Sequence, residues 1–395
     1  MPQSTLEPAV MRNDLDQISA PRGDMPGDEV PVAHLREDGN TLSVNPDPQN
    51  AETETFERSG DIILEFLRVN VPDFVRLSAV RKKGWENPAG DTYFRKQREA
   101  ADHADEKLSA VFYNMMKGIG TELHRKTQAL KIKGPALGQK RILDMCMAPG
   151  GFLAVALEKN PDAHALGFSL PVSQGGHKPL LPPSRNVDVK FMDITMLAQD
   201  MGVTDIPSDH PDSGNFISQQ LGPEDKFHLI LCDGQVLRQH GEFRAQYREK
   251  CEARRLTVTQ LAIGLEHLQP GGTMVVLLHK VEAWDTVLLL REFNKFSTVR
   301  LFKPSRSHVK RSSFYMVASK VQSQSAAAAA AVKVWKEVWR VSTFDLNGEM
   351  KHNWREEEPS AKDVIDEFGD QLIRLGRNVW KTQAEALERA TFIKG

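Results

Sequence analysis

The chain has 395 residues, of which 40% are hydrophobic, and 51 basic against 53 acidic residues give it a formal net charge of −2. This composition is typical of a soluble protein with one large domain plus extensions, or with two domains. It excludes a globally basic protein that binds polyanions over its whole surface, so any nucleic-acid surface is expected to be a local patch. The three cysteines have no paired spacing and indicate neither a disulfide framework nor a zinc site.

From the start of the chain we expect neither secretion nor membrane insertion. No basic segment is followed there by an apolar one, and no apolar run approaches the roughly 20 residues that span a bilayer. We therefore expect an intracellular protein, cytoplasmic or nuclear, in a reducing compartment and without a membrane partner. Residues 1–55 are rich in Pro, Asp, Glu, Gly and Asn at no regular period, which predicts a disordered N-terminal segment.

Residues 56–135 are predicted to form a helical N-terminal region. A first amphipathic helix should end before Pro72, and residues 94–130 carry apolar side chains at the i, i+3, i+4 spacing of a long helix. The basic cluster at residues 81–85 ends in a tryptophan. It could hold a nucleic-acid strand, but a solvated surface turn is the favoured interpretation.

Residues 136–320 alternate between short apolar runs and helical patterns, with a polar insert at 205–225 that we expect to be a surface excursion. This alternation predicts an α/β fold with one doubly wound sheet that binds its ligand at the carboxyl ends of the strands. Residues 321–395 form a helical C-terminal extension that should dock on the core or on a partner protein. Strands are expected at 142–144, 163–170, 187–193, 227–234, 273–278, 299–302 and 314–318, and the main helices of the core at 243–268 and 285–296.

The first strand ends at Asp144 and leads through Pro149-Gly150-Gly151 into a helix. Glycines let the backbone turn sharply and approach a ligand, although an ordinary strand-turn-helix connection would use the same residues. The G-x-G-x-x-G spacing is absent and the acid would repel a pyrophosphate, which disfavours a nicotinamide-dependent dehydrogenase. Two more strands end in acids, Asp193 and Asp233, so a site for a cationic or zwitterionic nucleoside cofactor is favoured over a simple turn.

With these motifs, residues 140–320 resemble the FtsJ-like, S-adenosylmethionine-dependent RNA ribose 2′-O-methyltransferases, which include cap-modifying enzymes. The resemblance implies a Rossmann-like methyltransferase sheet between helical N- and C-terminal extensions, with no general need for a metal. The matching motifs, in the order of that family, are residues 144–152, 231–234, 268–272, 301–304 and 312–315.

The resemblance also implies how S-adenosyl-L-methionine is held. The proline-glycine loop would hold its methionine part, and Asp193 would bond the amino group of its adenine. The cofactor-binding residues implied in this way are Asp144, Ala148, Pro149, Gly150, Gly151, Phe152, Asp193 and Asp233.

The family uses a lysine, aspartate, lysine and glutamate set to orient and deprotonate a ribose hydroxyl, because an unperturbed alcohol stays protonated near neutral pH. The resemblance assigns the aspartate to Asp233 and the upstream lysine to Lys117. Leu277 stands where the second lysine should be, so the nearby Lys280 and His279 are candidates to replace it. Ser313 stands at the position of the glutamate.

A basic loop before the last strand lies on the expected substrate side and is predicted to contact RNA phosphates. Its basic or titratable residues are Lys303, Arg306, His308, Lys310 and Arg311. Together these features predict a methyltransferase acting on an RNA ribose hydroxyl. The alternative, motivated by Leu277 and Ser313, is a catalytically degenerate protein of the same fold that binds cofactor or RNA as a scaffold.

Overall fold

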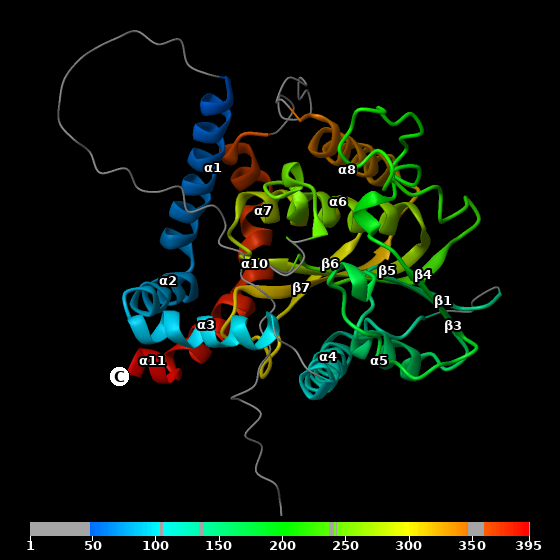
Figure 1. The fold of residues 1–395 in the computed structure, drawn as a ribbon. Helices are drawn as coiled ribbons and strands as arrows, with labels where there is room; N and C mark the ends of the chain where they lie inside the picture. The colour runs from blue at the N-terminus through cyan, green and yellow to red at the C-terminus, as the bar shows by residue number, and fades with distance from the viewer. Residues whose placement is uncertain are drawn as a thin grey trace, which may run out of the picture.

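The computed structural model describes residues 48–102, 106–133, 138–236, 241, 243–346 and 359–394. A seven-stranded sheet lies at its centre, in the order β3-β2-β1-β4-β5-β7-β6 (Figure 1). Strands β1 to β5 run parallel, and β7 lies antiparallel between β5 and β6. This is the Rossmann-like α/β sheet that the sequence predicts. The strands are β1 (Arg141–Asp144), β2 (His164–Ser169), β3 (Val187–Phe191), β4 (Phe227–Cys232), β5 (Leu268–His279), β6 (Thr298–Phe302) and β7 (Ser313–Val321).

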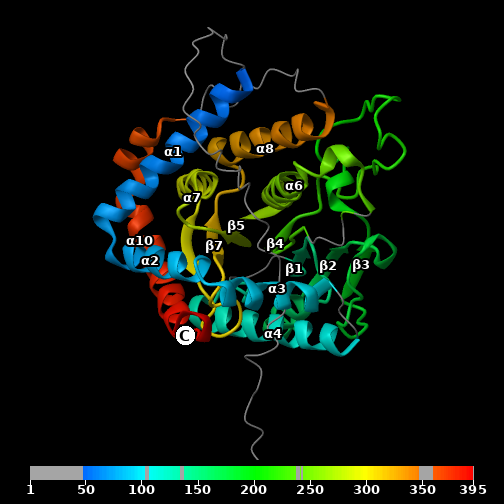
Figure 2. The ribbon, with the colours of Figure 1, turned by 60° about the vertical axis from the view of Figure 1, so that its left-hand side comes forward.

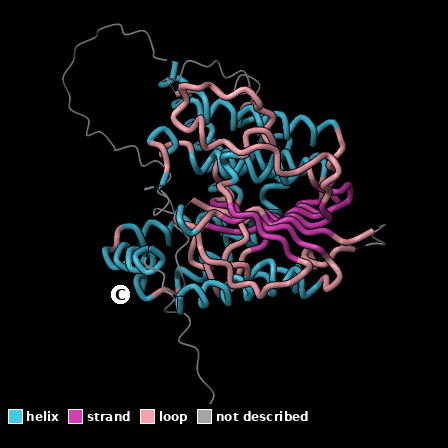
Figure 3. The backbone as a smooth tube through the Cα atoms, turned by 45° about the vertical axis from the view of Figure 1, so that its right-hand side comes forward, coloured by secondary structure: helices cyan, strands magenta, loops and turns pink. Residues whose placement is uncertain are grey.

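Helices cover both faces of the sheet, as Figure 3 shows. Successive residues of a strand point to opposite faces, and accordingly Ile142 packs in the apolar cluster with α4 and α5, whereas Leu143 packs in the cluster with α6, α7 and α8. The central strands are therefore apolar on both sides, which explains their nearly continuous hydrophobic runs. These helices are α4 (Glu106–Thr127), α5 (Gly151–Lys159), α6 (Glu252–Glu266), α7 (Trp284–Phe296) and α8 (Ala326–Phe344).

The two extensions pack on the α/β core and on each other. Figures 1 and 2 show α1, α2 and α10 side by side near α7, and the helix contacts agree. The C-terminal extension thus docks on this chain, and a protein partner for it stays a prediction. None of the described helices is long and apolar enough to cross a membrane. The helices of the extensions are α1 (Pro48–Asn70), α2 (Pro72–Trp85), α3 (Pro88–Asp102), α10 (Ala361–Glu388) and α11 (Thr391–Lys394).

In the N-terminal region, two expectations differ from the observed helices. Helix α1 begins at Pro48, inside the segment expected to be disordered, because Ile63 and Leu67 bury its second half and a nucleated helix extends at low cost; residues 1–47 lie outside the described residues. The pattern over residues 94–130 forms two helices, α3 and α4, because α3 packs on α2 and α11 whereas α4 packs on α5.

A buried ion pair joins the extensions to the sheet. Arg81 of α2 lies 2.5 Å from Glu282, which follows β5, and Arg81 also donates to Gln383 of α10 at 2.9 Å. The indole of Trp380 donates to the same glutamate at 3.0 Å. Burial would raise the pKa of the Glu282 carboxyl, but Arg81 outweighs it and holds the pKa below its ordinary value. Arg81, the first residue of the basic cluster at 81–85, therefore has a structural role, whereas Lys82 and Lys83 are exposed.

The helix after the proline-glycine loop packs directly on α4. A Cβ atom on Gly151 would lie 2.1 Å from the carbonyl oxygen of Tyr113, so no larger residue fits without moving one of the helices. Gly118, also on α4, has open space around it. This close approach fixes the start of α5 against the wall of helix α4.

We predict that Gly151→Ala lowers the free energy of unfolding by about 1–3 kcal/mol, the usual cost of overpacking a core. Gly118→Ala is the matched control and should be neutral or stabilising by up to about 1 kcal/mol, because alanine favours a helix more than glycine does. Chemical denaturation of both variants without cofactor measures the difference. Equal stability of the two variants would contradict the packing described for Gly151.

Candidate functional site

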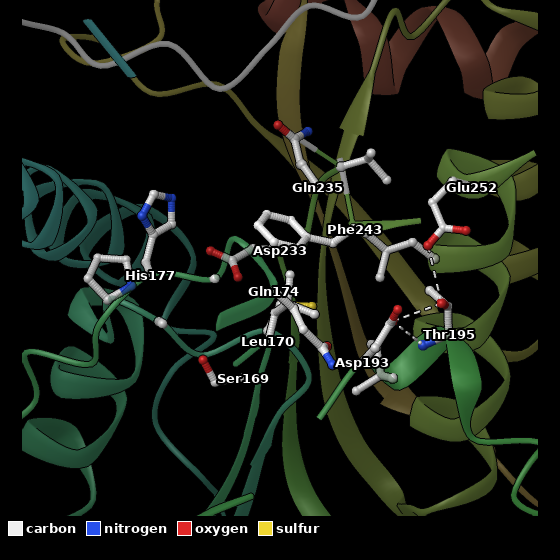
Figure 4. A pocket seen from close by; sticks show the side chains of 18 of the residues that line it. Ser169, Leu170, Gln174, His177, Asp193, Thr195, Asp233, Gln235, Phe243 and Glu252 are labelled. Carbon is white, nitrogen blue, oxygen red and sulfur yellow. Dashed lines mark hydrogen bonds between the residues drawn. The ribbon is translucent and has the colours of Figure 1, made fainter. Parts of the chain in front are cut away.

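A cavity opens at the carboxyl ends of the parallel strands. Figure 4 shows His177 on one side of it, Asp193, Thr195 and Glu252 on the other, and Asp233 between them. This is the edge of a doubly wound sheet at which ligands bind. The apolar part of the lining comes from α4, the loops after β1 and β2, and the start of α6, with Phe112, Met115, Met116, Leu170 and Leu256 as examples.

The proline-glycine loop forms the floor next to β1. The amide of Met145 donates to Leu231 at 2.9 Å and that of Met147 donates to Phe168 at 2.8 Å, so the loop is tied to both neighbouring strands. Gly150 has a φ of 99°, a conformation that favours glycine, and precedes the first residue of α5. Ala148 and Pro149 line the cavity.

Asp144, Gly150, Gly151 and Phe152 shape this loop without lining the cavity. Asp144 is buried at the end of β1 and accepts the amide of Cys146 at 3.2 Å. Direct contacts of these residues with a cofactor stay a prediction.

Asp193 caps the short turn after β3 and is held by two partners. Its Oδ1 accepts from the amide and hydroxyl of Thr195 at 2.9 and 2.8 Å, and its Oδ2 lies 2.5 Å from the Arg248 guanidinium. Burial would raise the pKa of this carboxyl, but Arg248 and Thr195 outweigh it and lower the pKa below its ordinary value. A carboxylate has about four acceptor positions, so an adenine amino group can still bind to it.

Arg248 belongs to a buried network that reaches the C-terminal extension. It pairs with Glu252 at 2.5 Å, and Glu252 pairs in turn with Arg255 at 2.8 Å. Arg255 donates to the side chain of Thr343 on α8 at 3.0 Å, and the indole of Trp339 donates to the carbonyl of Thr195 at 2.9 Å. Helix α8 therefore supports the wall of the cavity.

Around this network, the structure differs from two expectations, for the start of α6 and for the polar insert at 205–225. The helix expected from residue 243 begins only at Glu252, because Tyr247 and Arg248 turn inward to buried acids and break the pattern. The polar insert is not only a surface excursion, since Asp212 is buried and accepts from the Tyr247 hydroxyl at 2.8 Å. His210 is buried as well and lies 2.9 Å from the carbonyl of Thr343.

Asp233 follows β4 at the centre of the cavity and is 5% exposed. The next residue must be small, because a Cβ on Gly234 would lie 2.2 Å from the sulfur of Cys146. The Gly234 amide donates to Gln260 of α6 at 3.0 Å, which fixes the backbone after Asp233. Asp233 therefore shares one cavity with Pro149 and Asp193, as the resemblance implies.

The candidate lysines lie elsewhere. Lys117 is not among the residues that line the cavity, and its ammonium lies 5.7 Å from the ring centroid of Tyr113 on its own helix. Lys280 follows the end of β5, is exposed and has a φ of 47°. Leu277 is buried in the sheet opposite Tyr315. The catalytic role of either lysine stays a prediction, without support from the lining of the cavity.

His279, the third candidate, ends β5 and pairs with Ser313 across the antiparallel ladder. Its Nε2 lies 3.0 Å from Nε2 of Gln235, a residue that lines the cavity. Thr286 donates its hydroxyl to the His279 carbonyl at 2.9 Å. Of the three candidates, His279 is thus the one hydrogen-bonded to the cavity wall.

The basic loop does not present five cations. Lys303, His308 and Arg311 are buried, and the Lys303 ammonium donates to the carbonyl oxygens of His308 at 2.9 Å and Ser313 at 2.7 Å. The Lys310 ammonium lies 4.9 Å from the ring centroid of Tyr93. The prediction of a five-residue phosphate patch is therefore wrong for the three buried side chains, which shape the loop instead.

The cavity fits a nucleoside cofactor. Ser169 lines it at the end of β2, is 3% exposed, and its hydroxyl has no hydrogen-bond partner among the described residues. This is the place at which doubly wound enzymes bind a cofactor ribose, and a hydroxyl can both donate to and accept from that sugar. Ile194 and Leu256 offer an apolar surface for a base, with Asp193 at its edge. In the described part of the chain, no group of His, Cys, Asp or Glu is arranged to hold a metal ion.

The sheet, the glycine loop and the acids at the strand ends define a methyltransferase-fold protein. The family model of FtsJ-like methyltransferases matches residues 121–321, just over half of the chain, and the chain belongs to this family. The cofactor of FtsJ-like methyltransferases is S-adenosylmethionine, which agrees with the polar groups of the cavity described above. No curated protein sequence matches the chain.

Solved structures similar to the chain are distant. An O-methyltransferase family protein from Burkholderia thailandensis is 11% identical, with a TM-score of 0.32, and the match covers 63% of this chain and 72% of that one. Human methyltransferase-like protein 13, in complex with SAH, is 12% identical with a TM-score of 0.32, over 58% and 92%. An rRNA methylase from Streptococcus thermophilus is 12% identical with a TM-score of 0.28, over 55% and 100%.

The sequence alone does not identify several of the residues that line the cavity. Arg248 and Glu252 stand four residues apart, a spacing that is typical of an ordinary surface ion pair on the helix expected there. Gln235 follows the Asp233-Gly234 motif directly, and this proximity is the one signal that could have indicated it. Ser169 at the end of a strand gives no signal, because an acid is the expected ribose partner.

We predict that Asp193→Asn lowers the free energy of unfolding by about 1.5–3 kcal/mol at pH 7, because a charged hydrogen-bonded partner of Arg248 is lost. The pKa of Asp193 in the folded protein lies below its ordinary value of 3.8. The stabilisation that this carboxylate gives to the folded state is therefore complete above the ordinary pKa of 3.8, and it is lost as the pH falls through the lower pKa of the folded state. The difference between wild type and variant should accordingly shrink below about pH 4.

Denaturant unfolding between pH 7 and pH 3 measures this difference. Asp162→Asn, at an exposed turn, is the matched control and should change stability by less than about 0.5 kcal/mol at each pH. A difference for Asp193→Asn that does not change down to pH 3 would show that the charge on this carboxyl is not what stabilises the site.

Proposed function

We propose that the protein transfers the methyl group of S-adenosylmethionine to a ribose 2′-hydroxyl of RNA. The observation that carries the proposal is the position of Asp233: in a chain of the FtsJ-like family, this acid lies in one cavity with Pro149 of the glycine loop and Asp193. The cofactor supplies an electrophilic methyl on a sulfonium. The protein has to bring a hydroxyl to it and make that hydroxyl a better nucleophile.

Asp233 is suited to this task by its surroundings. It is 5% exposed, and the Gly234–Gln260 hydrogen bond fixes the backbone that carries it. The carboxyl can accept a hydrogen bond from the target hydroxyl and orient its oxygen for in-line attack. With the cofactor bound, its methyl group would pass from sulfur to this oxygen, and the hydroxyl proton would pass to Asp233 or to water beside it.

The mouth of the cavity also suits a nucleotide. Phe243 lines the cavity yet is 52% exposed, so its ring is available to stack on a base. Arg244 beside it also lines the cavity and offers a cationic group that phosphates attract. Burial lowers the pKa of its guanidinium from the ordinary value, but an arginine stays charged at neutral pH.

We expect Asp233→Asn to lower the rate of methyl transfer by about 10²–10⁴-fold, the range for losing a positioned acid or base. The assay uses labelled S-adenosylmethionine with an unmodified RNA and with the same RNA fully 2′-O-methylated. Affinity for S-adenosylhomocysteine, measured by calorimetry, should fall much less than the rate, which separates a loss of chemistry from a loss of cofactor binding. Asp188→Asn, an exposed acid on β3, is the control and should retain full activity.

Equal transfer to both RNAs would place the methyl group on a base and refute the ribose assignment. No transfer to any RNA, with S-adenosylhomocysteine still bound, would favour the second candidate function, a scaffold that binds cofactor or RNA without chemistry. The specific observation behind that candidate is that no lysine is among the described residues lining the cavity. The resemblance, which implies that Leu277 and Ser313 stand at the lysine and glutamate positions of the family, agrees with this observation.

A further inference from the structure

The two departures from the family's catalytic set lie on neighbouring strands. Leu277 of β5 pairs with Tyr315 of β7, and two residues further along β5 His279 pairs with Ser313. Residues two apart on a strand share a face, so His279 lies on the same face as Leu277, which the resemblance places at the lysine position. It is also directly opposite Ser313, which the resemblance places at the glutamate position. A polar, titratable side chain therefore stands one step along the same ladder.

His279 acts on the cavity through Gln235. The amide nitrogen of Gln235 lies 3.0 Å from Nε2 of His279, and Gln235 lines the cavity two residues after Asp233. The same nitrogen lies 3.4 Å from Nδ1 of His279, so the amide packs against the imidazole ring and contacts both of its nitrogen atoms. The pair therefore fixes one end of the Gln235 amide.

The other end of that amide has no hydrogen-bond partner in the part of the chain that the structure describes. Oε1 of Gln235 is buried and has no hydrogen-bond partner among the described residues. Exchanging the oxygen and nitrogen of the amide would leave a donor in place of the acceptor, so a polar atom is left over in either orientation. Buried polar groups of native proteins are normally hydrogen-bonded, and a ligand in the cavity would supply the missing partner.

We infer that Gln235, held by His279, positions the target hydroxyl beside Asp233 and takes the place of the missing lysine and glutamate pair. This inference rests on the proposed function. Gln235 contacts the substrate in this scheme, whereas His279 is a positioning residue that acts through Gln235. A neutral amide cannot take up a proton at neutral pH, so proton transfer stays with Asp233 or water and the task of Gln235 is orientation alone.

Single-turnover methyl transfer tests the pair with Gln235→Leu, His279→Leu and the double variant. Each single variant should lower the rate roughly 10- to 100-fold, the effect of a misplaced nucleophile. The double variant should be no more than about twofold slower than Gln235→Leu, since the two residues act through each other. Affinity for S-adenosylhomocysteine and the melting temperature should match wild type, and Gln322→Leu, exposed after β7, is the control.

Multiplicative losses in the double variant, or wild-type rates in Gln235→Leu, would overturn the inference while leaving the proposed function intact. If the wild type itself transfers no methyl group, the proposed function fails, and RNA affinity in the presence of S-adenosylhomocysteine becomes the measurement. Weaker binding of unmodified RNA by Gln235→Leu, with binding of 2′-O-methylated RNA unchanged, would still support Gln235 as the hydroxyl partner. If wild type and Gln235→Leu bind unmodified RNA with equal affinity, Gln235 is not the partner of the hydroxyl.

Discussion

The guanidinium of Arg248 is the contact on which the cavity depends most. It lies between Asp193 and Glu252, at 2.5 Å from each, and 3.9 Å from Asp212. Burial would lower the pKa of Arg248, but the two nearer acids outweigh it and raise the pKa above its ordinary value. Buried charges of this kind contribute little net stability when paired, yet removing one partner leaves the others uncompensated and destabilises the folded state. The network therefore specifies one geometry for the wall that faces the cofactor.

Much of the fold could be predicted from the sequence because its signals are local. Apolar runs closed by acids at Asp144, Asp193 and Asp233 indicate parallel strands with a ligand edge, and the glycine loop indicates the first turn. The start of α6 could not be predicted in this way. Residues 243–251 have a helical pattern, and only contacts with acids distant in sequence, Asp193 and Asp212, turn Tyr247 and Arg248 out of it.

The same distinction separates the cofactor side of the site from the substrate side. The cofactor side uses a backbone turn and carboxyls at strand ends, both of which leave a sequence motif. On the substrate side, the spacing after Leu277 makes His279 a candidate, but its hydrogen bond to the cavity wall involves Gln235, to which spacing alone assigns no role. In the basic loop, by contrast, a local sequence signal is misleading. Five cationic or titratable residues near one another in sequence predict a phosphate-binding patch, but the Lys303 ammonium donates its hydrogen bonds to backbone carbonyls.

The contact of Trp339 with the carbonyl of Thr195 has a consequence for the extent of the domain. The family match ends at residue 321, before α8 begins at Ala326. A fragment cut at that point would expose the apolar face of α6 and leave Arg255 and the Thr195 carbonyl without their partners from α8. Helix α8 therefore belongs to the packed methyltransferase unit of this chain, although the family match ends before it.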